Sequence, residues 1–299
     1  MLGVIGGSGV YHIEGLEDAR WVRAESAFGE PSDEVLMASL SGNPIAFLPR
    51  HGRGHRISPS DINYRANIDA LKRLGVTDIV SVSAVGSLRE DLAPGIFVIV
   101  DQFIDRTFAR EKSFFGSGLV AHVSMAHPIC NRLGEHLHAA ANRIGIPTVK
   151  GGTYLVMEGM QFSTLAESEL YRSWQCDVIG MTNMPEAKLA REAEMCYASV
   201  AMVTDYDCWH PDHDNVTVDA IVKVLLANAD RARSLVKEVS DQVSGDAAAS
   251  KCSCRSALQY AILTAPEARD PAMIERLSAV AGRMLKPAAQ SSILNPHPS

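Results

Sequence analysis

The stretch Ala201-Met202-Val203-Thr204-Asp205-Tyr206-Asp207-Cys208-Trp209 begins as an apolar run and ends in two carboxylates. The apolar half is typical of a buried strand, in which successive side chains point to opposite sides. We therefore expect Asp205 and Asp207, two residues apart, on one side and within reach of the same small molecule. Two acids held close together cannot both ionise cheaply, so one of them should hold a proton near neutral pH.

This acid pair has three interpretations. A protonated carboxyl beside an ionised one offers a donor and an acceptor, which suits a ring nitrogen next to an amino group, as at N7 and N6 of adenine. A solvated turn after a core strand is the commoner role of two acids at this spacing. Carboxylates also bind Mg²⁺ or Ca²⁺. The rest of the chain decides among these alternatives.

The composition limits the class of protein. The chain has 299 residues, 46% of them hydrophobic and 21% charged, which is typical of a globular protein with a sizeable core. A net charge of −7 argues against nucleic acid as a partner. No run approaches the roughly 18 apolar residues of a membrane span, and the N-terminus lacks the basic region of a signal peptide. We expect a cytoplasmic enzyme. The six cysteines show no zinc spacing, and no metal site is predicted.

Apolar runs rich in β-branched residues alternate with amphipathic helical patterns. Strands are expected at 2–5, 44–48, 78–83, 95–101, 151–157, 177–181 and 196–204, and helices at 61–74, 131–144, 164–174, 185–193 and 217–239. This alternation predicts an α/β fold with a central mixed β-sheet flanked by helices in a single domain over residues 1–240. A linker at 241–251, a C-terminal helical segment at 252–286 packing on the core, and a flexible tail at 287–299 should follow.

Several expected strand ends carry groups that bind anions. In open α/β sheets, ligands bind beyond the carboxyl ends of the strands. Glycine-rich amides, hydroxyl groups, one permanent cation and one titratable cation stand there, and together they predict a phosphate pocket. These groups belong to Ser8 in Gly6-Gly7-Ser8-Gly9, to Arg50 and His51, to Ser83 and Ala84, and to Thr182. The first glycines lack the Gly-x-Gly-x-x-Gly spacing of a dinucleotide site.

Longer motifs carry a resemblance to a known family. They are Val4-Ile-Gly-Gly-Ser-Gly9, Pro49-Arg-His-Gly52, Pro59-Ser-Asp-Ile-Asn-Tyr-Arg-Ala-Asn67, Ala84-Val-Gly-Ser-Leu-Arg89, Asp101-Gln-Phe-Ile-Asp-Arg-Thr107, Glu158-Gly159 with Phe162-Ser163, Met181-Thr182 with Pro185-Glu186, and Thr204-Asp-Tyr-Asp-Cys-Trp209. With these motifs in order from about residue 2 to 239, the chain resembles the trimeric purine nucleoside phosphorylases. The resemblance implies the fold of that family and reversible cleavage of a nucleoside by phosphate, without a metal or organic cofactor.

The resemblance also implies a role for each matching residue. Ser8, Arg50, His51, Ser83, Ala84 and Thr182 would hold phosphate, the co-substrate. Met181 would lie under the ribose and Phe162 on the purine, while Ser163, Asp205 and Asp207 would read the purine edge. Thr204 would be a further substrate-binding residue. Asp205 would share a proton with N7, which supplies the acid that the leaving base needs.

Substrate choice is expected from two places. Relatives that prefer 6-oxopurines carry Glu after the Phe and Asn in place of Asp205, so Ser163 and Asp205 favour adenine. Val218, Ile221 and Val222 offer an apolar wall for a 5′-methylthio group. The expected substrate is S-methyl-5′-thioadenosine, which would give adenine and 5-methylthioribose 1-phosphate. A 6-oxopurine or methylthioinosine phosphorylase and a non-catalytic nucleoside-binding protein are the alternatives.

Further expectations concern the assembly and the departures from the family pattern. His122 matches a residue that reaches the site from a neighbouring subunit, so we expect a homotrimer. Met160 replaces a proline of the family, and Gly180 stands where relatives often carry Asn, either widening the pocket or sparing a side chain near the phosphate. Cys252-Ser-Cys254 could close a small strained disulfide, but two unlinked thiols are expected.

Overall fold

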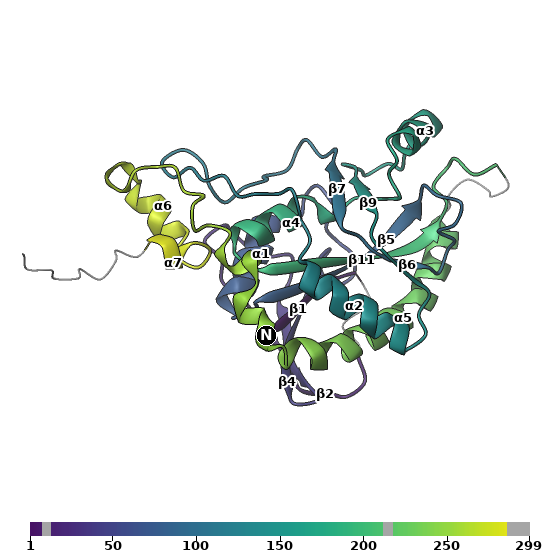
Figure 1. Cartoon of the computed structure of the whole chain (residues 1–299), viewed down its shortest axis with the longest axis horizontal. Helices are drawn as coiled ribbons and strands as arrows, with labels where there is room; N and C mark the ends of the chain where they lie inside the picture. Colours follow the sequence, from purple (N-terminus) through teal and green to yellow (C-terminus); the bar gives the residue numbers. More distant parts are fainter. Residues whose placement is uncertain (8–12, 212–217, 286–299) are drawn as a thin grey trace, which may run out of the picture.

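The computed structural model describes residues 1–7, 13–211 and 218–285, which form one mixed sheet covered by helices (Figure 1). The strands are β1 (Leu2–Gly6), β2 (Leu16–Val22), β3 (Val35–Leu40), β4 (Asn43–Pro49), β5 (Asp78–Ser87), β6 (Phe97–Ile99), β7 (Gln102–Asp105), β8 (Thr148–Lys150), β9 (Thr153–Val156), β10 (Val178–Gly180) and β11 (Cys196–Asp205). The helices are α1 (Tyr64–Arg73), α2 (Asn131–Arg143), α3 (Leu165–Ser173), α4 (Asn183–Glu192), α5 (Val218–Ser244), α6 (Pro271–Arg276) and α7 (Gly282–Leu285). The predicted α/β fold with a mixed sheet is confirmed.

The centre of the sheet is parallel. β1 pairs in parallel with β4 and β5, and β5 pairs in parallel with β11, so the carboxyl ends of these four strands meet at one edge. β10 continues the sheet antiparallel to β5 and leads through β9 to β7. β11 is buried along nearly its whole length, as expected of a parallel strand covered on both faces.

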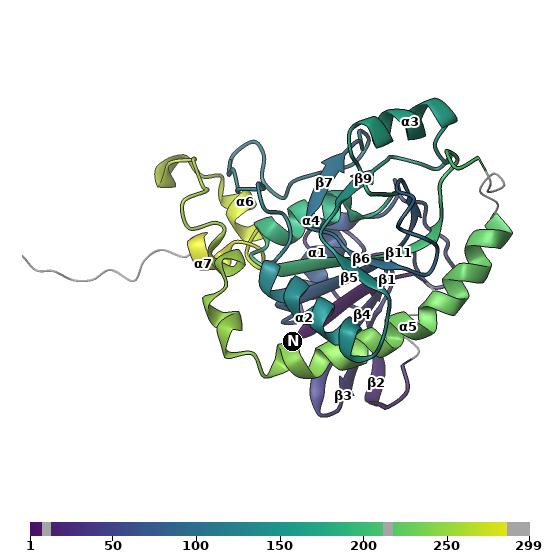
Figure 2. The ribbon, with the colours of Figure 1, turned by 45° about the vertical axis from the view of Figure 1, so that its right-hand side comes forward.

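Two helix pairs cover the centre of the sheet. α2 packs against α5, and α1 packs against α4 (Figures 1 and 2). β11 contacts α4 as well as α2 and α5, so it lies between the two pairs. The caps explain where some helices begin. Asn63 accepts from the amide of Ala66 at α1, and Thr164 forms a capping box with Glu167 at α3.

The observed strands depart from the prediction at the margins. The expected strand 78–83 extends to Ser87, because β5 leaves its pairing with β1 and continues alongside β10. β2, β3, β7 and β8 were not predicted. β2 is an edge strand with mostly exposed, charged side chains, so it lacks the apolar pattern that identifies a core strand.

The predicted linker at 241–251 is not a linker of irregular structure. α5 continues to Ser244, and the alanine-rich residues Ala247–Lys251 form a 3-10 helix, η1, capped by Asp246. The helical segment expected at 252–286 consists of short pieces. These are the 3-10 turns η2 (Ser253–Ser256) and η3 (Pro266–Ala268), followed by α6 and α7. This C-terminal segment lies against one end of the core (Figure 1).

The C-terminal segment is joined to the core by ion pairs and buried side chains. Arg283 pairs with Glu194 and Arg255 with Asp78. The buried side chain of Leu258 belongs to the main apolar cluster. The predicted tail 287–299 lies outside the described residues.

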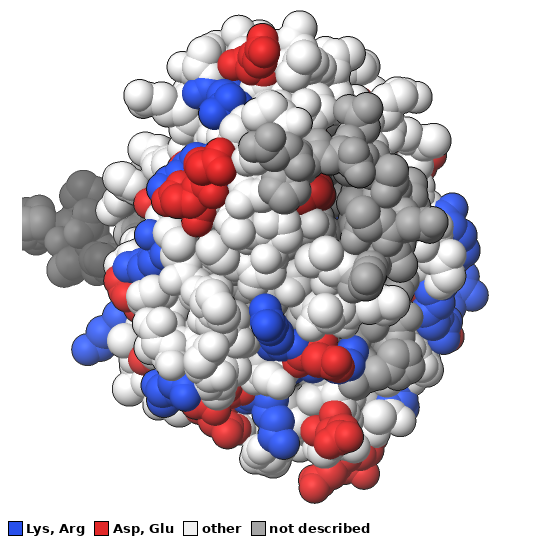
Figure 3. Space-filling model, turned by 90° about the vertical axis from the view of Figure 1, so that its right-hand side faces the viewer, with Lys and Arg blue, Asp and Glu red and all other residues white. Residues whose placement is uncertain are grey.

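Among the described residues, no helix combines the length and the apolar character needed to cross a membrane. On the face drawn in Figure 3, basic and acidic side chains are interspersed around a largely uncharged middle. The described residues of this face therefore form no basic stripe that would follow a phosphate backbone.

Candidate active site

A cavity of about 640 Å³ opens at the edge where the parallel strands end. Gly7 follows β1, Arg50 and His51 follow β4, and the middle of β5 and the end of β11 supply further walls. The remaining walls come from the loop after β9 and from the junction of β10 with α4. Ligands of open α/β sheets bind at this kind of edge.

Arg50 is fixed at the wall of this cavity by buried partners. Only 2% of the residue is exposed, and its Nε lies 2.9 Å from Oε2 of Glu186. Nη1 donates to the carbonyl oxygen of Val82 and Nη2 to the hydroxyl of Ser81. A buried guanidinium in an ion pair keeps a fixed direction, which suits a site that must bind an anion in one place.

His51 is a neutral group rather than a second cation. Its Nδ1 lies 2.9 Å from the carbonyl oxygen of Ile57, so Nδ1 carries the ring proton, because a carbonyl oxygen only accepts. Burial lowers the pKa of His51 to about 4, and the charge of Arg50 acts in the same direction. His51, expected from the sequence as a titratable group, is therefore uncharged at neutral pH. Its Nε2 remains an acceptor.

Hydroxyl groups form the next part of the wall. Ser83 lies within β5 rather than after its end, and its Oγ donates to Oδ1 of the buried Asn183. Thr182 is the N-cap residue of α4 and makes no cap hydrogen bond with its side chain. Both residues line the cavity beside the start of α4, where Met184 departs from helical geometry.

Of the two roles that the sequence left open for Gly180, the surroundings favour the spared side chain. A Cβ atom at Gly180 would overlap Oη of Tyr154. That hydroxyl lies 3.4 Å from Oγ of Ser83, and the Tyr154 side chain is fully buried. Tyr154 therefore fills the space that a larger residue at position 180 would need. Sequence patterns did not single out Tyr154, because it lies inside a strand and far from residue 180.

A buried ion pair holds the loop that carries Met181. Arg110 donates through Nε to Glu158 at 3.1 Å and through Nη1 to the carbonyl oxygens of Met181 and Met184, each at 2.6 Å. Glu158 also accepts from the Ser60 hydroxyl and from the amides of residues 108 and 109, and its pKa is lowered to about 2 because these hydrogen bonds outweigh the effect of burial. Arg110 was not predicted as a site residue.

Asp205 and Asp207 both line the cavity, but not by strand alternation. β11 ends at Asp205, and Asp207 has a positive φ of 52° in the following turn. Burial is the main cause that raises the pKa of each carboxyl; the charge of Asp205 contributes less to the pKa of Asp207. The expected proton near neutral pH is thus favoured mainly by loss of water and not by mutual repulsion.

The hydrogen bonds of the two acids differ. Oδ2 of Asp205 accepts from the Thr204 hydroxyl at 2.6 Å, and its Oδ1 accepts from the Asp207 amide at 2.9 Å. Oδ2 of Asp207 is buried and has no partner among the described residues. Among the described residues, only one group of three or more acidic, His or Cys side chains has the geometry to bind a metal ion. Neither Asp205 nor Asp207 belongs to that group. The arrangement favours a ligand that offers hydrogen-bond donors over a metal ion.

The cavity brings together most of the predicted site residues. They are Arg50, His51, Ser83, Ala84, Phe162, Met181, Thr182, Thr204, Asp205 and Asp207. Ser163 does not line it, and its Oγ lies 3.8 Å from the sulfur of Met157. Exposed His122 lies on a loop whose backbone bonds to Ala261, and it does not line the cavity of its own chain.

Other predicted residues fall outside the described part of the structure. Ser8 is one of them, and so are the side chains of Val218, Ile221 and Val222 at the start of α5. Apolar residues that were not predicted also line the cavity, namely Met157, Ile179 and Met202. They are ordinary apolar residues of strands or loops, so the sequence does not show whether they line the cavity or pack in the hydrophobic core.

Comparison with known proteins identifies the family. The family model described as the phosphorylase superfamily matches residues 1–241. The chain belongs to this superfamily. The match covers every strand, the helices α1 to α4 and most of α5, together with the residues that line the cavity.

Relatives within the phosphorylase superfamily match nearly the whole chain. The S-methyl-5′-thioadenosine phosphorylase of Rhodospirillum rubrum is 65% identical, over 95% of this chain and 97% of its own length. A methylthioadenosine phosphorylase from an antarctic soil metagenomic library has a similar structure, with a TM-score of 0.89 at 48% identity, over 93% of this chain and 98% of that one. A mutant Schistosoma mansoni adenosine/methylthioadenosine phosphorylase in complex with methylthioadenosine has a TM-score of 0.78 at 36% identity. The alignment covers 86% of this chain and 96% of that one.

Proposed function

We propose that this chain catalyses the reversible phosphorolysis of S-methyl-5′-thioadenosine. Phosphate attacks C1′, the bond to the base breaks, and adenine and 5-methylthioribose 1-phosphate are released. The observation that carries this proposal is one cavity that joins two buried carboxyls to an anion-binding wall at the strand ends. Sequence identities of 65% and 64% over nearly the whole chain, with proteins named for this activity, support the proposal.

The anion-binding wall would hold the phosphate below the ribose. Arg50 supplies the permanent positive charge, Ser83 and Thr182 supply hydroxyls, and Ala84 and the start of α4 supply amides. Neutral His51 accepts the hydroxyl hydrogen of a protonated phosphate through Nε2. Ser8 completes this set. Phosphate is the second substrate, and no metal or organic cofactor takes part in this reaction.

The acid pair would bind the adenine edge. A protonated Asp205 gives its proton to N7 as the base leaves, so that the base departs as a neutral molecule. Asp207 accepts from the N6 amino group through its unpartnered Oδ2. A 6-oxo group at this position would face that carboxylate oxygen, and such a mismatch excludes hypoxanthine by several kcal/mol.

The remaining groups would position the sugar. Met181 lies under the ribose, Phe162 packs on the purine beside Ser163, and the apolar wall of Val218, Ile221 and Val222 holds the methylthio group. We propose a cytoplasmic homotrimer in which His122 completes the site of the neighbouring subunit. The exposed position of His122, on a loop away from its own cavity, supports this arrangement.

A comparison of four nucleosides tests the proposal. Methylthioadenosine, adenosine, inosine and methylthioinosine are each incubated with the purified protein, with and without phosphate, and the free base is measured. We expect phosphate-dependent release of adenine, fastest from methylthioadenosine. Preferential release of hypoxanthine would assign a 6-oxopurine phosphorylase instead. Tight nucleoside binding without release at high phosphate would show a binding protein.

A further inference from the structure

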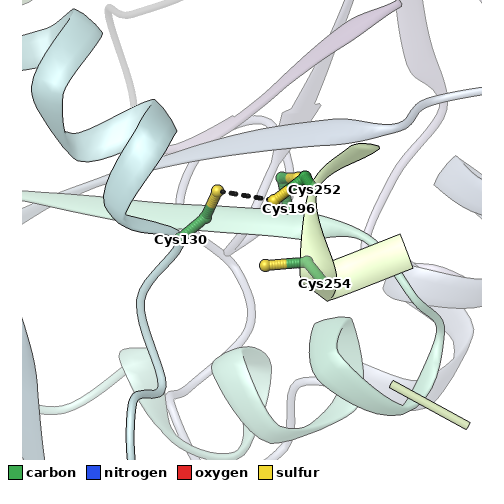
Figure 4. Close-up of side chains that lie close together, drawn as sticks. All are labelled: Cys130, Cys196, Cys252 and Cys254. Atoms are coloured by element: carbon green, nitrogen blue, oxygen red, sulfur yellow. Dashed lines mark hydrogen bonds between the residues drawn. The ribbon is translucent and has the colours of Figure 1, made fainter. Parts of the chain in front are cut away.

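Four cysteines that are far apart in the sequence meet outside the cavity. Cys130 is the N-cap residue of α2, Cys196 begins β11, and Cys252 and Cys254 flank the start of η2. Their sulfur atoms all lie within 4.8 Å of one another, and three of the four residues are buried (Figure 4). The proposed reaction uses none of these thiols.

The sulfur positions fit the corners of a tetrahedron. A Zn²⁺ ion bound by four thiolates at about 2.3 Å places the sulfurs about 3.8 Å apart, by the geometry of a regular tetrahedron. The sulfurs of Cys130 and Cys252 lie 3.6 Å apart, and all six cysteines of the chain are free thiols in the structure. Small shifts of the remaining sulfurs would close a shell around one ion. A cluster with several metal atoms would need more widely separated sulfurs.

Positively charged groups lie beside three of the four sulfurs. A site of four thiolates and one Zn²⁺ carries two net negative charges. Arg191 donates through Nη1 to the sulfur of Cys254 at 3.6 Å, and Cys130 stands at the positive N-terminus of α2. Arg132 interacts with Cys196, and its buried Nε has no hydrogen-bond acceptor among the described residues. A thiolate that turns toward a metal ion can serve as that acceptor.

We propose that Cys130, Cys196, Cys252 and Cys254 bind one structural Zn²⁺ ion. The four ligands leave no open position for substrate or water, so the ion has a structural role. It joins the C-terminal segment to β11 and to the start of α2, and binding releases the thiol protons to solvent. The cysteine spacing hid this site, because two ligands come from the core and two from the C-terminal segment.

The metal content of the wild-type protein is the first test. The protein is purified without a histidine tag in buffers that contain neither metal nor chelator, and its metals are measured by inductively coupled plasma mass spectrometry. We expect one zinc ion per chain. After chelation in denaturant without reductant, we expect all six thiols of the chain to react. Reaction of Cys176 and Cys208 alone, with no metal, would show two disulfides and overturn the proposal. Iron in place of zinc, seen by its visible absorption, would overturn the choice of metal.

Variants give the second test, with a matched control. Cys252→Ser and Cys254→Ser should each lower the bound zinc at least tenfold, whereas Cys176→Ser, a buried cysteine outside the group, should retain it. Limited proteolysis should cut the C-terminal segment faster in the zinc-free variants and in chelated wild-type protein than in the control. Full zinc content in both Cys252→Ser and Cys254→Ser would contradict the assignment. The wild-type measurement stands even where a variant fails to fold.

Discussion

At the scale of single residues, Asp205 and Asp207 have different capacities for a ligand. Both oxygens of Asp205 already accept hydrogen bonds, from the Thr204 hydroxyl and the Asp207 amide, and burial outweighs these bonds and raises its pKa, which favours a carboxyl that carries a proton. Asp207 has a buried oxygen with no partner among the described residues, which costs about 1–3 kcal/mol until a donor arrives. These differences match a proton donor at N7 and an acceptor at N6.

The first prediction concerns these two acids. Asp205→Asn should lower kcat about 10²–10⁴-fold, because an amide has no acidic proton to give the leaving base. Turnover of the wild type should also fall as pH rises through the raised pKa of Asp205, as the donor loses its proton. Steady-state kinetics at a series of pH values measure both effects. Urea unfolding shows whether the variant is folded. The control Asp207→Asn keeps an acceptor oxygen and should raise KM more than it lowers kcat. Full turnover in folded Asp205→Asn would refute the donor role.

The second prediction concerns Gly180. Gly180→Ala should destabilise the protein by about 1–3 kcal/mol, since the new methyl group meets the buried Tyr154 hydroxyl. In a Tyr154→Leu background, the same substitution should cost at least about 0.5 kcal/mol less. Urea unfolding of the four proteins measures this coupling. Gly116→Ala, where a Cβ meets no atom within 4 Å, is the control. If the stability effects of Gly180→Ala and Tyr154→Leu were strictly additive, Tyr154 would not be the reason that position 180 requires glycine.

At the scale of elements, apolar β-branched runs identified the central strands, because parallel strands covered on both faces must be apolar throughout. The sequence placed Arg50, Thr182 and Asp205 at strand ends, and the structure brings all three to one cavity. The sequence could not show that β5 continues past Ser83. Beyond its pairing with β1, β5 pairs with β10, a strand from a distant part of the chain. Arg110 was missed for the same reason, because it acts through backbone carbonyls distant in sequence.

The third prediction concerns α4, where Glu192 accepts from the Phe114 amide and the Ser113 hydroxyl. Burial raises the pKa of Glu192 to about 7, against an ordinary value of 4.5. Between these values the folded protein holds a proton that the unfolded chain has lost. The free energy of unfolding therefore falls as pH rises through this window, by about 3 kcal/mol in total from this residue.

Glu192→Gln stays neutral and should remove this contribution. Urea unfolding at pH 4 and pH 8 measures the pH dependence of stability in the wild type and the variant. We expect the loss of stability toward pH 8 to be smaller in Glu192→Gln. The matched control is Glu275→Gln on the exposed surface of α6. An equal change in both variants would contradict the role of burial.

At the scale of the whole molecule, the sequence predicted the single α/β core, but not how the C-terminal segment joins it. Residues 241–251 are polar and small, a composition shared by linkers and by capped 3-10 turns, and only tertiary contacts separate the two. Asp246, for example, caps η1 and also pairs with Arg132 of α2. The same contacts bring Cys252 and Cys254 beside two cysteines of the core.

The fourth prediction concerns the proposed trimer and follows from the position of His122. If each site takes His122 from a neighbour, His122→Ala subunits keep an intact Asp205 but impair the next site. Asp205→Asn subunits have the opposite defect. Either variant alone should turn over methylthioadenosine slowly. In randomly mixed cyclic trimers, about a quarter of the sites combine the intact halves of both subunits, so activity should return.

Co-expression of the two variants with separable tags, followed by kinetics on the mixed oligomer, measures this return. Native mass spectrometry gives the number of subunits. The control pairs His122→Ala with the Asp205→Asn/His122→Ala double variant, which has no intact half to contribute and should stay inactive. Because a His122 that served its own cavity would leave no complete site in any mixture, activity in the mixed oligomer requires that the site lies between subunits. A mixed trimer as inactive as its parents would place His122 outside the neighbouring site.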